Sequence, residues 1–211
     1  MKNKGRYSTA GSSEGEYQPG SDNKVLKNLL GIIQLSDLEI LESNKLTELT
    51  KQLIFSLKKG HRFIEKDIQK IHRQWLQDIY AWAGNYRQVN MSKGGFSFTA
   101  AHVIPKLMQE FEKNILVQFT PCIFEDKREI LTALATVHVE LVLIHPFREG
   151  NGRLARLLST LMVLQAGLPI LNFSSIKGDL QEEYFAAVRS GLDRNYQPME
   201  IIFSKILLQS Q

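Results

Sequence analysis

Residues 145–156 read His-Pro-Phe-Arg-Glu-Gly-Asn-Gly-Arg-Leu-Ala-Arg, and this stretch separates two long apolar stripes of helical spacing. The stripe before it recurs at steps of three or four residues, at Ile130, Leu134, Val137, Leu141 and Ile144. The stripe after it holds Leu154, Leu157, Leu158, Leu161 and Met162. Because a proline disfavours helical geometry in the residue before it, the first helix is predicted to end at Ile144. The stretch is therefore a corner between two packed helices.

Two glycines in this corner, Gly150 and Gly152, favour the binding of an anion. Glycine adopts a positive φ without strain, so successive N–H groups near these residues can converge on one ligand. The second helix begins here, and its unpaired N–H groups and positive dipole end point into the same space. The sequence therefore predicts a phosphate site at the start of that helix.

Ionisable side chains surround the predicted phosphate site. Arg153 and Arg156 are three residues apart and share one helical face, where two guanidinium groups suit a polyphosphate. Glu149 offers hard oxygen ligands that could hold Mg²⁺ between phosphate oxygens. The ordinary pKa of a histidine imidazole is about 6.5, so His145 can take a proton from an attacking hydroxyl at neutral pH. Together these groups indicate chemistry on a nucleotide phosphate.

The rest of the chain is predicted to be helical, with one exception. Residues 1–22 are rich in Gly, Ser, Glu and Lys and are predicted to form a mobile or surface-draped tail, followed by a single domain over 23–211. Further apolar stripes predict helices over about 38–60, 68–84, 101–116, 179–191 and 196–208. The exception is 88–99, where the Gly94-Gly95 pair between short alternating runs favours a β-hairpin. The predicted class is all-α with one small hairpin.

The composition limits the classes of function open to the chain. Of 211 residues, 43% are hydrophobic and 23% charged, which is typical of a globular protein rather than a disordered or repetitive one. The net charge is only +4, and the basic residues are spread along the chain. No direct nucleic-acid partner is therefore expected. The single cysteine, Cys122, excludes an internal disulfide. No apolar run suits a membrane span or signal peptide, so a cytoplasmic location and no membrane partner are predicted.

The corner resembles the signature of the Fic family, His-x-Phe-x-(Asp/Glu)-Gly-Asn-Gly-Arg-x-x-Arg, which residues 145–156 match at every defined position. Residues 82–87, Trp-Ala-Gly-Asn-Tyr-Arg, together with the Gly94-Gly95 pair, are similar to the flap region of that family. Residues 17–28 resemble the N-terminus of short cell-filamentation-type members. The resemblance covers roughly 17–205 and implies the Fic fold, a helical bundle with a small β-hairpin flap.

The resemblance also implies an activity, the transfer of AMP from ATP to a Ser, Thr or Tyr hydroxyl of a target protein. Such a protein adenylyltransferase is a nucleotidyltransferase. The target would dock on the flap, about Val89–Phe98, by pairing its backbone as an added strand.

The same resemblance assigns roles to individual residues of the corner. His145 becomes the general base, Glu149 the Mg²⁺ ligand, and Phe147 a buried anchor that fixes the loop. Arg156 would grip the γ-phosphate. The phosphates would be cradled by Gly150, Asn151, Gly152 and Arg153.

Other activities stay open at this point. Doc-type members, which resemble kinases and phosphorylate their targets, depart from the Gly-Asn-Gly-Arg loop that this chain keeps. Phosphocholine transfer from CDP-choline is not excluded by the motif. A catalytically silent nucleotide-binding interaction module is a further alternative, although the intact His145, Glu149 and Arg156 argue against it. The target and the oligomeric state do not follow from the sequence, and a homo-oligomer is left open.

The mode of control is predicted from a missing motif. Self-inhibited relatives resemble one another in carrying Ser/Thr-x-x-x-Glu-(Gly/Asn), whose Glu pairs with the residue that matches Arg156. Here Ser12-x-x-x-Glu16 is followed by Tyr17, and Thr136-x-x-x-Glu140 is followed by Leu141, so neither fits. The resemblance therefore implies a toxin held in check by a separate small antitoxin protein.

Overall fold

The structure is a computed structural model that describes residues 13–93, 95–176 and 178–210. Residues 1–12 of the predicted tail, with Gly94, Lys177 and Gln211, lie outside the described residues. The helices are α1 (Leu35–Ser56), α2 (Glu65–Leu76), α3 (Ile104–Phe111), α4 (Val117–Phe119), α5 (Lys127–Ile144), α6 (Asn151–Gln165), α7 (Asp179–Ser190) and α8 (Gln197–Gln209). Strands β1 (Ser92–Lys93) and β2 (Phe96–Ser97) pair antiparallel as a hairpin. The predicted all-α class with one small hairpin is confirmed.

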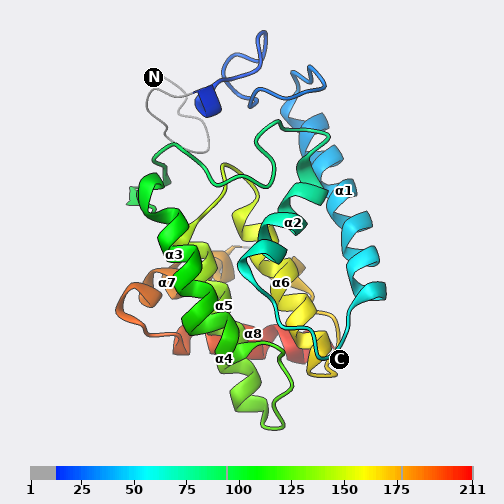
Figure 1. The fold of residues 1–211 in the computed structure, drawn as a ribbon, viewed down its shortest axis with the longest axis vertical. Coiled ribbons are helices and arrows are strands. Elements are labelled where there is room, and N and C mark those ends of the chain that lie inside the picture. The colour runs from blue at the N-terminus through cyan, green and yellow to red at the C-terminus, as the bar shows by residue number, and fades with distance from the viewer. Residues whose placement is uncertain (1–12, 94, 177, 211) are drawn as a thin grey trace.

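Helix α5 is the centre of the fold (Figure 1). Its residues 133–139 are all buried, so neighbouring elements cover every side of the helix. It packs against α3, α6, α7 and α8, whereas α1 and α2 pack against each other and against α6 (Figure 1). The Asp126 carboxylate caps the start of α5 by accepting a hydrogen bond of 2.8 Å from the Arg128 N–H. The centre of the bundle thus leads directly into the corner at 145–150.

Several predicted helix boundaries are shifted by a turn or more. Helix α1 spans Leu35–Ser56, whereas the predicted helix covers about 38–60. Helix α2 ends at Leu76, although its apolar stripe continues to Trp82. Residues 77–84 form turns instead, and they close at Gly84, whose φ of +82° suits glycine. These turns carry apolar side chains back onto the core without a helix.

The predicted hairpin has strands of two residues each. Gly95 lies in its turn with a φ of +81°, the left-handed geometry that tight hairpin turns require. Val89 and Met91 form a small buried cluster with Phe98, separate from the main core. The flap is therefore attached to the bundle but adds little to its core.

The described part of the predicted tail is held by specific contacts. Tyr17 forms a β-bridge with Leu26, and the Glu16 carboxylate pairs with the Lys27 ammonium at 2.7 Å. Val25 is fully buried in the core.

Among the described residues, no helix combines the length and the apolar character that a membrane crossing needs.

Candidate active site

The corner between α5 and α6 is made by two residues in the left-handed conformation. Helix α5 ends at Ile144, as predicted, because His145 caps it with φ 52° and ψ 57°. Gly150 has a φ of +84° and caps α6, which begins at Asn151. The N-terminus of α6 therefore opens directly into the loop that carries the histidine and the glutamate.

The two glycines of the corner have different tasks. A Cβ on Gly150 would lie 2.6 Å from a ring carbon of Trp75, so both its φ and its surroundings require glycine. Gly152 is different, and the expectation of a positive φ there is wrong: it lies in the first turn of α6, and its φ is not positive. A Cβ on Gly152 would meet nothing within 4 Å. Open space therefore lies over the first turn of α6, where an anion would approach its N–H groups.

The corner loop is fixed by its own hydrogen bonds and by one buried histidine of α2. The Asn151 amide oxygen accepts from the Phe147 N–H at 2.8 Å, and its NH₂ donates to the Phe147 carbonyl at 2.7 Å. Phe147 is fully buried and stacks on the His72 ring, with centroids 3.8 Å apart. Asn151 thus closes the loop, and Phe147 lies where an anchor was predicted.

His72 connects this loop to the turn after α2. Its Nδ1 accepts from the Gly84 N–H at 2.9 Å, so its Nε2 carries the proton and donates to the Glu149 carbonyl at 3.1 Å. Burial lowers the pKa of His72 to about 4, and the imidazole is neutral at physiological pH. The sequence prediction did not include this residue among the site residues.

His145 is oriented by the end of its own helix. Its Nδ1 lies 3.1 Å from the Val142 carbonyl oxygen, a partner that can only accept, so Nδ1 carries the proton and Nε2 has a lone pair. The side chain is buried, and the Phe98 ring of the flap stacks on the imidazole with centroids 3.7 Å apart. The tautomer therefore suits a general base at Nε2, on a buried imidazole that has one face stacked against the flap.

Arg87 ties the base of the flap to the corner. Its guanidinium donates to the carbonyls of Val89 at 2.7 Å and Thr99 at 2.5 Å, one at each end of the flap. Its Nε donates to the His145 carbonyl at 2.7 Å, and its backbone N–H donates to the Pro146 carbonyl at 2.9 Å. Burial lowers the pKa of Arg87 to about 10, so it stays charged at neutral pH. The sequence comparison placed Arg87 in the flap region but assigned it no role, because its partners here are backbone carbonyls that residue identity does not reveal.

The predicted cationic side chains come together on one surface. A hollow of about 210 Å³ lies between α1 and α6 and is lined by Leu46, Thr50, Arg153, Arg156, Leu157, Thr160 and Phe173. The Arg156 Nε donates to the Gly152 carbonyl at 3.2 Å, and its guanidinium lies 6.0 Å from the Phe173 ring. Both predicted arginines therefore border one open space along the N-terminal half of α6.

Arg153 is held more tightly than Arg156. Its Nη2 lies 2.6 Å from a carboxylate oxygen of Glu42, on α1, and 3.6 Å from one of Glu149. Its guanidinium also lies over the Trp75 ring at 4.6 Å. Sequence reasoning missed Glu42, although a signal exists: this charged residue lies on the apolar stripe of Leu38, Leu46 and Leu49.

Glu149 has the chemistry of the predicted Mg²⁺ ligand. Its carboxylate accepts a 3.0 Å hydrogen bond from the Gly150 N–H and lies at the start of α6, where phosphates would gather. Mg²⁺ commonly takes one or two protein carboxylates and completes its shell with substrate phosphates and water. One carboxylate at this place fits that pattern.

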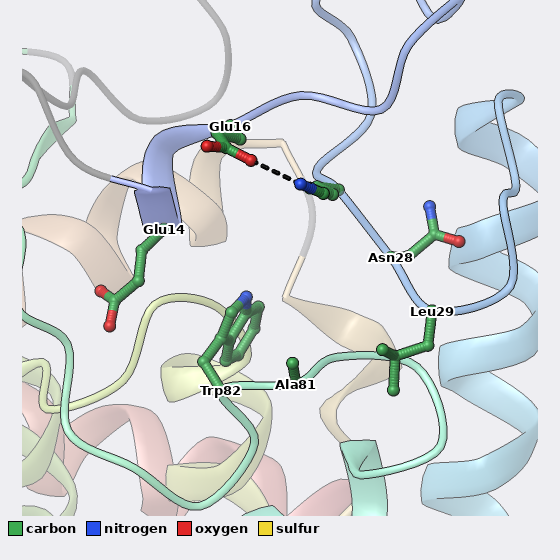
Figure 2. Close-up of a pocket in the computed structure, with 7 residues that line it drawn as sticks. Glu14, Glu16, Asn28, Leu29, Ala81 and Trp82 are labelled. Atoms are coloured by element: carbon green, nitrogen blue, oxygen red, sulfur yellow. Dashed lines mark hydrogen bonds and ion pairs between the residues drawn. The ribbon is translucent and has the colours of Figure 1, made fainter.

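A short segment before α1 also reaches the corner. The Arg148 Nε donates to the Glu14 carbonyl at 2.9 Å, and the Glu14 carboxylate accepts from the Gln88 N–H at 2.9 Å. Beside this segment is a pocket of about 410 Å³ lined by Glu14, Glu16, Lys27, Asn28, Leu29, Ala81 and Trp82 (Figure 2). It contains none of the predicted site residues, so it is separate from the corner.

Comparison with known proteins identifies the family. The sequence model described as "Fic/DOC family" matches residues 62–163. The "Probable protein adenylyltransferase Fic" of Escherichia coli K12 is 30% identical over 148 residues, which are 68% of this chain and 69% of the relative. Its counterpart in Salmonella typhimurium is 31% identical over 146 residues, 67% of this chain and 68% of the relative. This chain belongs to the Fic/DOC family.

Solved structures of Fic domains confirm the fold. BepC of Bartonella tribocorum, solved with bound AMPPNP, has a TM-score of 0.69 at 23% identity, covering 86% of this chain and 91% of its own. The Fic domain of Bep8 from Bartonella sp. 1-1C has a TM-score of 0.73 at 20% identity, covering 89% and 91%. The predicted Fic fold and family are confirmed, and the names of the curated relatives place the family among nucleotidyltransferases.

The Fic/DOC match includes α2, the flap, the corner and most of α6. Helix α1, which carries Glu42, lies before the matched residues. The pairing of Glu42 with Arg153 is therefore a contact made between the matched region and a helix outside it.

Proposed function

We propose that this protein is a protein adenylyltransferase, which moves AMP from ATP to a Ser, Thr or Tyr hydroxyl of a target protein. The observation that carries the proposal is one corner that combines the His145 imidazole, the open N-terminus of α6 and two arginines around a hollow. The names of the curated relatives support it, as does the ATP analogue AMPPNP bound to the similar BepC structure.

In the proposed reaction, the hydroxyl oxygen of the target attacks the α-phosphorus of ATP. A bond forms between that oxygen and the phosphorus, the bond to the bridging oxygen of the β-phosphate breaks, and pyrophosphate leaves. The hydroxyl proton goes to Nε2 of His145, whose Nδ1 proton is held by the Val142 carbonyl.

The phosphates would be held by several groups of this chain. The N–H groups of the α6 N-terminus, over the open space at Gly152, would bind phosphate oxygens. Arg153 and Arg156 would bind the β- and γ-phosphates from the hollow beside them. Glu149 would hold Mg²⁺, which supplies charge neutralisation to the phosphates when bound. Positioning and charge stabilisation are the main contributions of a protein to such a transfer.

The flap, about Val89–Phe98, would bind the target as an added strand. Since His145 is buried and Phe98 stacks on one face of its ring, we expect a docked target to shift the flap as its hydroxyl approaches Nε2. Target binding and exposure of the base would then occur together, which protects ATP from water in the absence of a target.

The transferred group is tested by mass spectrometry of the purified protein and of a host lysate. Wild type and the His145→Ala variant are each incubated with ATP and Mg²⁺, and in parallel with CDP-choline. The proposal expects an adenylyl adduct in the wild type only. A phosphoryl or phosphocholine adduct would favour the alternative transfers, and no adduct despite nucleotide binding would favour the silent binding module.

We further propose control by a separate antitoxin that places a glutamate in the hollow beside Arg156. In support, the two tail glutamates have other partners: the Glu14 carboxylate accepts from the Gln88 N–H, and Glu16 pairs with Lys27. Replacement of Glu14 or Glu16 by Gly is expected to leave automodification unchanged. A sharp rise in automodification would show that control lies within the chain.

A further inference from the structure

Glu42 is a buried residue of α1 whose carboxylate pairs with Arg153, one of the residues that line the hollow. Its side chain is 5% exposed, and its Oε2 lies 2.6 Å from Arg153 Nη2. A buried carboxylate is costly unless it is paired and hydrogen-bonded, so such a residue on an apolar helix face calls for a reason.

The position of Glu42 is fixed from the side away from Arg153. The Tyr80 hydroxyl donates to its Oε1 at 2.6 Å, and the Trp75 indole N–H donates to its backbone carbonyl at 2.8 Å. Burial and the adjacent carboxylate raise the pKa of Tyr80, so the hydroxyl keeps its proton and remains a donor. Glu42 is therefore held in place by its neighbours. The longer, partly exposed side chain of Arg153 takes its position from Glu42.

Arg153 lies within reach of two carboxylates, and Glu42 determines which of them it pairs with. Its Nη2 lies nearer to Glu42, at 2.6 Å, than to Glu149, at 3.6 Å. Without the Glu42 charge, the guanidinium would be drawn towards Glu149, away from the hollow and onto the carboxylate assigned to Mg²⁺. Both ion pairs are measured from Nη2, so the two carboxylates lie on the same side of the guanidinium group.

We propose that Glu42 is a positioning residue for ATP binding, which holds Arg153 at the hollow and keeps it from collapsing onto Glu149. The inference rests on the proposed function, because it takes the hollow as the site of the triphosphate. It concerns a helix that lies outside the residues matched by the family model.

An inhibitory role for Glu42 is the opposite interpretation of the same contact. An inhibitory carboxylate has to leave its arginine when ATP binds. Glu42 is held by Tyr80 and Trp75 and is buried against α2, so it has no path out that leaves the packing of α1 intact. The structure therefore favours positioning over inhibition.

The test uses Glu42→Gln, which keeps the shape and a hydrogen bond to Tyr80 but removes the charge. Glu39→Gln, an exposed neutralisation on the same helix, is the matched control. Affinity for AMPPNP is measured by calorimetry, and KM for ATP and kcat are measured by automodification. Thermal unfolding of each variant confirms that it is folded.

For Glu42→Gln we expect AMPPNP affinity to fall and KM for ATP to rise by about tenfold or more, with a much smaller change in kcat. Glu39→Gln should match the wild type. A merely structural role would lower the unfolding temperature without this split between KM and kcat.

Unchanged affinity in a folded Glu42→Gln variant would overturn the inference while the proposed function stands. Higher automodification in that variant would also overturn it, because it would identify the pair as inhibitory. A wild type that binds no AMPPNP would overturn the proposed function first, and this inference with it.

Discussion

The corner at 145–151 and the flap at 89–98 face each other across His145, yet they are built in different ways. The corner is buried throughout, closed by Asn151 and backed by the His72 ring. The flap has two-residue strands, an exposed turn at Gly95 and a small cluster of its own. The groups assigned to chemistry thus lie on rigid support, and the segment assigned to the target lies where motion costs little.

The largest difference in stability is expected when a glycine with a positive φ is replaced by alanine in each region. Gly150→Ala places a Cβ 2.6 Å from the Trp75 ring at a φ of +84°, and it should lower the free energy of unfolding by about 3 kcal/mol or more. Gly95→Ala has a φ of +81° but meets nothing within 4 Å, so it should cost only about 1 kcal/mol. Urea unfolding of both variants measures the two effects, and equal losses would contradict the comparison.

The second test concerns pH and the support of the corner. The pKa of His72 is about 4 in the folded protein, below its ordinary 6.5. The neutral imidazole therefore contributes stability that is fully present above about pH 6.5 and is lost as pH falls towards 4. His138, with a pKa lowered to about 3 by burial, acts in the same direction, so the comparison needs a His72 variant.

The wild type should lose up to a few kcal/mol between pH 7 and pH 4.5, and His72→Gln should lose clearly less over the same range. Urea unfolding at a series of pH values provides the measurement. If the free energy of unfolding had the same pH dependence in both proteins, His72 would not be the neutral, buried support of the corner that the geometry indicates. Phe98→Ala, in the flap, should keep the steep wild-type profile.

These predictions also show how far the sequence could define the molecule. Pro146 places the end of α5 at Ile144, and the Gly94-Gly95 pair predicts the hairpin, because both signals are local. The motif likewise brings His145 and both arginines to one corner. By contrast, Glu42 and Arg87 reach the corner from remote segments, and their partners depend on packing.

The error at Gly152 has a similar cause. A glycine pair suggests a loop, but α6 begins at Asn151, so Gly152 is helical and only Gly150 has a positive φ. A glycine can be needed for its positive φ, for a close contact with a neighbour, or for the open space it leaves. These cases are distinguished by the φ angle and by the atoms that a Cβ would meet. That information comes from Trp75 in α2, not from the neighbouring residues.

A third test removes the flap residue that covers the base. Phe98→Ala should cost about 1 kcal/mol or less in stability, because the ring is only partly buried in a small cluster. It should also speed the reaction of His145 with diethyl pyrocarbonate several-fold, since the stacked ring leaves. Mass spectrometry of the modified peptide, with the exposed His102 as internal control, gives the rate. An unchanged rate would mean that Phe98 does not cover the base.

The smallest expected change in stability comes from the second glycine of the corner. Gly152→Ala lies in a helix with open space around its Cβ, so it should raise the free energy of unfolding by about 0.5–1 kcal/mol. The added methyl enters the space assigned to phosphate, and AMPPNP affinity should fall at the same time. A variant that gains stability and keeps full affinity would place the phosphates elsewhere.

The central claim is that the corner holds ATP so that His145 can activate a hydroxyl for attack on the α-phosphorus. It is tested most directly by labelling with ATP carrying radioactive phosphorus at either the α or the γ position, using wild type and His145→Ala. The account predicts label in protein from α-labelled ATP with wild type alone, and none from γ-labelled ATP. Equal α-label in the two proteins, or transfer of the γ-label, would contradict it.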